Sequence, residues 1–133
     1  MEQPTDAHWV LKAMVAVAGA DGRLNAHEVG LIQKVYQDET GHSVDVSGIF
    51  RAVQAYATRR DVLSELSGVA GSMSAEVKEK IIRAAYLTLL AEGRIAGEEF
   101  KTLKDIAAAL QVSAHQFQAI IEDAERNSGE GPD

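Results

Sequence analysis

A short turn that ends one helix and starts the next occurs twice in this chain, and it constrains the fold more than any other sequence feature. Residues 20–29 read ADGRLNAHEV and residues 91–100 read AEGRIAGEEF, so that alanine, glycine, arginine and glutamate recur 71 positions later. The same spacing pairs apolar residues of three successive predicted helices: Leu11 with Ile82, Ala13 with Ala84, Ile32 with Leu103, Val35 with Ile106, Ile49 with Ile120 and Phe50 with Ile121. This pattern predicts an internal duplication.

The residues of the turn explain its helix-breaking character. Gly22 and its second copy can each take the left-handed conformation that ends a helix. Asn25 followed three residues later by Glu28 is the capping-box signature of a new helix. The acid before the glycine, Asp21 or Glu92, falls at a helix C-terminus, where the helix dipole disfavours negative charge by about 0.3–1 kcal/mol. Because this unfavourable placement occurs twice, it indicates a role such as cation binding.

These motifs resemble those of a known family. Residues 20–24 with Glu28, and residues 91–95 with Glu99, are similar to the paired ADGxI…E signatures of the TerB tellurite-resistance family. The resemblance covers residues 9–121. It implies a compact all-helical domain with internal pseudo-symmetry and an acidic cluster associated with metal binding. It also implies a place in bacterial stress systems or in membrane-anchored co-chaperones of the DjlA type.

Four carboxylates of the repeated turns form the candidate metal site, namely Asp21, Glu28, Glu92 and Glu99. Oxygen ligands of this kind suit Ca²⁺, Mg²⁺ or Mn²⁺. The opening acidic ligands of an EF-hand are missing from the sequence before both turns, which excludes true EF-hands. The second copy departs from the family signature, because Glu92 replaces aspartate and Ala96 provides no cap. A purely structural role stays open, since Asp-Gly is ordinary turn chemistry and Glu28 serves helix capping.

Helical periodicity along the chain predicts an all-α fold of about seven helices, with no period-two strand pattern. The predicted helices cover about residues 5–20, 25–37, 43–56, 61–69, 74–91, 100–110 and 113–126. Two pseudo-symmetric three-helix units, joined by the helix near residues 59–70, form a single domain of residues 1–126, and residues 127–133 form a disordered acidic tail. The larger aromatic side chains are expected to be core or interface anchors: Trp9, Tyr36, Phe50, Tyr56, Tyr86, Phe100 and Phe117.

Composition narrows the classes of partner and compartment. The formal charge is −7, and no basic stripe is present, so nucleic acid is not an expected partner. The chain has no cysteine, which excludes a disulfide framework and agrees with a reducing compartment. No signal sequence and no apolar run long enough to cross a bilayer occurs, so that we expect a cytoplasmic protein without membrane insertion.

Enzyme signatures are absent from the sequence: there is no Gly-rich phosphate loop, no Gly-x-Ser-x-Gly and no His-Glu-x-x-His. We therefore expect a non-enzymatic stress-response module that binds a divalent cation and docks onto a partner protein, for example at the cytoplasmic side of a membrane protein. Two alternatives stay open. One is a metal-independent protein-interaction domain of co-chaperone type, and the other is a small hydrolase whose paired carboxylates carry out acid–base chemistry.

Overall fold

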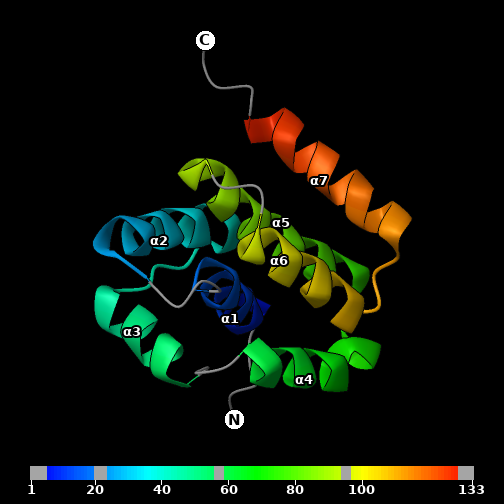
Figure 1. Cartoon of the computed structure of the whole chain (residues 1–133), viewed down its shortest axis with the longest axis horizontal. Helices are drawn as coiled ribbons and strands as arrows, with labels where there is room; N and C mark the ends of the chain where they lie inside the picture. Colours follow the sequence, from blue (N-terminus) through cyan, green and yellow to red (C-terminus); the bar gives the residue numbers. More distant parts are fainter. Residues whose placement is uncertain (1–5, 20–23, 56–58, 94–96, 129–133) are drawn as a thin grey trace.

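The described part of the chain is entirely helical in the computed structural model, as the periodicity predicts (Figure 1). The structure describes residues 6–19, 24–55, 59–93 and 97–128, and for a few residues at helix ends, Glu92 among them, the backbone alone. The helices are α1 (Asp6–Ala18), α2 (Ala26–Thr40), α3 (Val46–Ala55), α4 (Arg59–Val69), α5 (Ala75–Glu92), α6 (Glu98–Ala109) and α7 (Ala114–Ser128), with a 3₁₀ turn at Ala70–Ser72 between α4 and α5.

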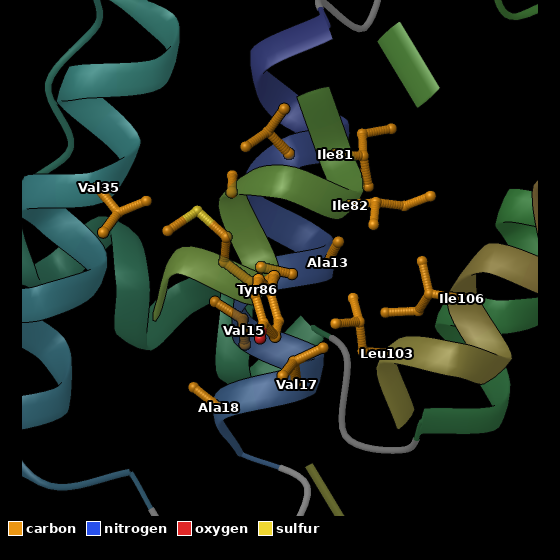
Figure 2. Packing of buried hydrophobic residues seen from close by; sticks show 14 of the residues in the cluster. Ala13, Val15, Val17, Ala18, Val35, Ile81, Ile82, Tyr86, Leu103 and Ile106 are labelled. Atoms are coloured by element: carbon orange, nitrogen blue, oxygen red, sulfur yellow. The ribbon is translucent and has the colours of Figure 1, made fainter. Parts of the chain in front are cut away.

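The helices α1 and α5 pack against each other at the centre of the bundle. The last half of α1 carries small and apolar residues without charge, and its Ala13 and Val17 are fully buried. On α5, Ala84 and Ala85 are also fully buried, and these small side chains let two helices approach closely. Figure 2 shows Leu103 and other side chains of α6 pointing toward this pair. The helices α2, α3 and α4 pack around α1, while α7 packs on α5 (Figure 1).

Local capping interactions set the starts of α2, α5 and α7. The side chain of Asn25 accepts a hydrogen bond from the backbone N–H of Glu28, and Glu28 Oε1 accepts one from the N–H of Asn25. The hydroxyl of Ser74 caps α5 by accepting from the N–H of Val77. At the start of α7, Ser113 Oγ accepts a hydrogen bond from the backbone N–H of Gln116, and Gln116 Oε1 accepts one from the N–H of Ser113. Each cap satisfies a backbone donor that a helix start would leave without a partner.

Gly93, the second copy of Gly22, ends α5 in the left-handed conformation that the repeat predicts, with φ of 76°. Gly22 itself lies outside the described residues. The helix α2 ends in the same way at Gly41, with φ of 79°. The N–H of Gly93 donates to the carbonyl oxygens of Leu89 and Leu90, which closes the last turn of the helix.

We expect Gly93→Ala to lower the free energy of unfolding by about 1 kcal/mol, because an alanine Cβ is disfavoured at positive φ. A Cβ at Gly93 meets no atom within 4 Å, so the loss measures backbone strain alone. The matched control is Gly30→Ala, at an exposed position inside α2 with similarly free space, which should stabilise by about 0.5–1 kcal/mol. Urea unfolding compares the two variants. Equal effects would mean that Gly93 contributes nothing special to the turn.

The third helix of each unit departs from the predicted register. On α3, Ile49 is fully buried, but Phe50 is 50% exposed, so Phe50 is not a core residue, and of its two predicted roles only that of an interface anchor remains. On α7, Ile121 is buried and Ile120 only half-buried, which is the reverse of the pairing that the 71-residue spacing predicts. The buried position on α7 is therefore one residue later than the pairing with α3 predicts. The two helices differ because α3 packs against α1 and α2, whereas α7 packs against α5.

Several helices extend beyond their predicted ends. The helix α2 continues to Thr40, α6 begins at Glu98, and α7 continues to Ser128, into the segment expected to be a tail. The linking helix α4 begins at Arg59, within the predicted linker near residues 59–70. A helix commonly extends by a turn beyond its last apolar contact, because its backbone hydrogen bonds continue without one. The rest of the predicted tail, residues 129–133, and the aromatic Tyr56 lie outside the described residues.

Candidate functional site

The carboxylate of Glu28 lies at the start of α2, where the capping box fixes it. Glu28 is 4% exposed, and its Oε1 lies 3.0 Å from the backbone nitrogen of Asn25. The side chain therefore satisfies a helix donor and is also held in place facing the interior. This geometry supports the structural role, and it leaves the second carboxylate oxygen outside the capping interaction.

The carboxylate of Glu99 occupies the equivalent place in the second copy, in the first turn of α6. It is 5% exposed, close to the value for Glu28, although the local chain differs because Gly97 precedes α6 with φ of 82° and provides no side-chain cap. The repeat thus places a buried glutamate at the beginning of α2 and of α6. The neighbouring acid Glu98 is exposed to solvent.

Asp21 lies outside the described residues. Glu92 is the last residue of α5, as the repeat predicts, and its side chain is not described. Within the described ranges, no three His, Cys, Asp or Glu side chains gather closely enough to hold a metal ion. The convergence of all four candidate ligands on one cation therefore stays a prediction.

A buried lysine on α1 is a feature that the sequence analysis missed. Lys12 is 7% exposed, and its Nζ lies 2.5 Å from Oε1 of Glu65 on α4 and 4.3 Å from the ring centroid of Trp9. The ion pair and the aromatic ring compensate a charge that would otherwise be costly to bury. The position of Lys12 as a single lysine within an otherwise apolar helical run could have indicated that it is buried. Nothing in the neighbouring sequence identifies Glu65 as its partner.

A polar contact also ties α7 to the core. The hydroxyl of Tyr86 on α5 donates to Oε2 of Glu125 on α7 at 2.6 Å. Burial raises the pKa of Tyr86 to about 12, and the nearby carboxylate of Glu125 adds to the shift because a second negative charge would be unfavourable beside it. The rings of Tyr86 and Phe100 meet edge to face at 6.4 Å, and Phe100 contacts Phe117 at 6.1 Å. These contacts connect α5, α6 and α7.

The outward face of α3 exposes two large apolar side chains. Val46 and Phe50, one helical turn apart, are 45% and 50% exposed, whereas Ile49 between them is fully buried. Arg51 and Gln54 lie on the same outward side and are exposed as well. Single exposed apolar residues are common on protein surfaces, but a pair at i and i+4 forms a continuous strip to which a partner can bind.

Comparison of the chain with protein-family models, with curated proteins and with solved structures found no match. Within the ranges that the structure describes, none of the helices combines the length and the apolar character needed to span a bilayer. The assignment of function therefore depends on the residues themselves.

Proposed function

We propose that this chain is a TerB-like, non-enzymatic module of a bacterial stress response, which binds a divalent cation and docks onto a partner protein in the cytoplasm. The observation that supports it is the pair of buried glutamates, Glu28 and Glu99, at equivalent places in the two repeated turns. A carboxylate is costly to bury unless hydrogen-bond donors or a positive charge compensate it. A bound Ca²⁺, Mg²⁺ or Mn²⁺ is one source of that charge.

The chemistry of the four acids fits such an ion. In the proposed site, Glu28 and Glu99 would supply buried oxygen ligands from α2 and α6, and Asp21 and Glu92 would complete the set. Hard cations prefer several carboxylate oxygens, which these positions provide. When bound, the cation would compensate the negative charge of these four acids and hold the two turns together.

The metal-independent interaction domain is the second candidate, and the capping box favours it. Glu28 already accepts the N–H of Asn25, which accounts for its position without a cation. In that case the exposed strip of Val46 and Phe50 on α3 is the main functional feature, and the acids of the turns have a structural role only.

The cation proposal predicts a rise in melting temperature when Ca²⁺ or Mn²⁺ is added. A ligand that binds only the folded chain stabilises it by RT ln(1 + [L]/Kd), or about 1.4 kcal/mol at a free concentration ten times Kd. Glu99→Gln should abolish the rise, and so should Asp21→Asn combined with Glu92→Gln. Thermal unfolding and titration calorimetry measure both effects.

Glu76→Gln is the matched control, because Glu76 is an exposed acid in the first turn of α5. This variant should respond to the cation like the unmodified chain. If the unmodified chain shows no melting shift and no heat of binding at millimolar Ca²⁺ or Mn²⁺, the interaction domain without metal takes precedence.

A further inference from the structure

In the described part of the chain, the helix α7 lies at one edge of the bundle and packs mainly against one other helix. In the described part of the chain its extensive contact is with α5 alone, and Figure 1 shows it at one side of the molecule, away from α3 and α4. Ile121 and Ala124 are its buried apolar residues, while Phe117 and Ile120 are half-buried. The face opposite these residues is polar and solvated.

A hollow of about 460 Å³ lies between the first half of α7 and the beginning of α5. Its lining includes Lys78 and Glu79 from α5, and Gln116, Ala119 and Ile120 from α7. The first turns of α7 therefore do not pack tightly on α5. The firm contact begins further along the helix, at Ile121 and at the hydrogen bond from Tyr86 to Glu125.

The connection from α6 to α7 is short and conformationally strained. Residues 110–113 join the two helices, and Gln111 has φ of 64°, the sole positive φ at a non-glycine position in the described ranges. The chain uses glycine at the corresponding left-handed positions that end α2 and α5, Gly41 and Gly93. A glutamine pays a steric penalty there, which an extended connection would remove. Short, strained connections of this kind favour the exchange of a terminal element between two copies.

We propose that α7 exchanges between two copies of this chain, each copy receiving the partner's α7 in the groove formed by α5 and α6. The groove fits this occupant because it already holds the same helix. The hydroxyl of Tyr86 donates to the carboxylate of Glu125, the ring of Phe100 contacts that of Phe117, and α7 packs along α5. All these contacts are reformed in the exchanged dimer, while the strain at Gln111 is released. The inference is independent of the cation proposal.

The first test measures whether the groove accepts α7 in trans. A fluorescein-labelled peptide of residues 113–128 is added to the full chain, and binding is followed by fluorescence anisotropy. Glu125→Ala in the full chain weakens the binding of the chain's own α7 to the groove, while the peptide keeps its glutamate. The peptide should therefore bind about tenfold more tightly to this variant, as expected when a competing helix loses a hydrogen bond to a charged group. Glu122→Ala, an exposed acid on the same helix, is the matched control and should change binding by less than twofold.

The second test measures the dimer itself by size-exclusion chromatography with light scattering, after incubation of the full chain at millimolar concentration near its melting temperature. The dimer should form and persist on dilution. Gln111→Gly removes the strain from the monomer and should lower the dimer association constant by about fivefold for each chain. A chain that stays monomeric at all concentrations overturns the proposal. A peptide that fails to bind also overturns the proposal. So does a peptide whose affinity rises equally for Glu125→Ala and Glu122→Ala, provided that circular dichroism shows both variants to be folded.

Discussion

Ile82→Ala is expected to lower the free energy of unfolding by about 2–5 kcal/mol, because Ile82 is fully buried on α5 and the substitution leaves a cavity at the centre of the bundle. The helix α5 packs against α1, α2, α6 and α7, so the surrounding side chains belong to several helices and cannot collapse into the space together. Urea unfolding monitored by circular dichroism measures the change as a shift in midpoint at constant slope.

The control for this prediction comes from the 71-residue spacing of the repeat in the sequence. Leu11 is the counterpart of Ile82 in the first unit, and it is only half-buried. Leu11→Ala removes a similar amount of apolar side chain but should cost less than half as much, since less surface returns to water. Equal losses at the two positions would mean that the loss does not follow the burial of the side chain, which differs between Leu11 and Ile82.

Raising the pH from 10 to 12 should destabilise the chain by about 2 kcal/mol relative to the Tyr86→Phe variant. The pKa of Tyr86 is about 12 in the folded chain and 10.0 in its ordinary state, because burial and Glu125 disfavour the phenolate. Between these values the unfolded chain has released the phenolic proton while the folded chain keeps it, so stability falls by about 1.4 kcal/mol per pH unit. Below pH 10 the contribution is fully present.

The measurement pairs chemical unfolding at several pH values with ultraviolet titration of tyrosinate. Burial also raises the pKa of Tyr36, but Tyr36 is present in both proteins, so its effect cancels in the comparison. In the unmodified chain one tyrosine should titrate near pH 12, and this transition should be missing from Tyr86→Phe. Identical pH dependence of stability in the two proteins would mean that Tyr86 ionises as freely in the folded chain as in the unfolded one.

The helices of this chain could be predicted because their ends are determined by local interactions. The caps at Asn25, Ser74 and Ser113 join residues only three positions apart, and Gly41 and Gly93 need no distant contact to adopt positive φ. Such signals are complete within a short window of sequence. They predict the position of such a helix end to within a few residues, whatever the helix packs against.

The orientation of α3 could not be read from the sequence in the same way. Ile49 and Phe50 are both apolar and adjacent, so the pattern allows either to face the core. The choice depends on how α1 and α2 meet the helix, and it differs from the choice made by α7 on α5. The contacts of Lys12 with Glu65 and of Tyr86 with Glu125 join residues 53 and 39 positions apart, which no local pattern indicates.

The residues of the candidate site could be predicted from the sequence, but their burial and their arrangement in space could not. Recurrence of the turn identified Glu28 and Glu99, and the structure places both in buried positions near helix starts. Their burial was not evident from the sequence, because glutamates early in a helix are usually exposed and interact with the helix dipole. Whether Asp21 and Glu92 join them depends on how the two turns approach in space, which a repeat in the sequence does not determine.

The most direct measurement is a crystal structure of the chain grown with Ca²⁺, with the ion located by its anomalous scattering. The proposal predicts one strong peak between the two repeated turns, at about 2.3–2.6 Å from carboxylate oxygens of Glu28 and Glu99, with Asp21 and Glu92 completing the ligand set. An ordered structure in which the four carboxylates lie too far apart to share an ion, with no peak between the turns, would contradict it.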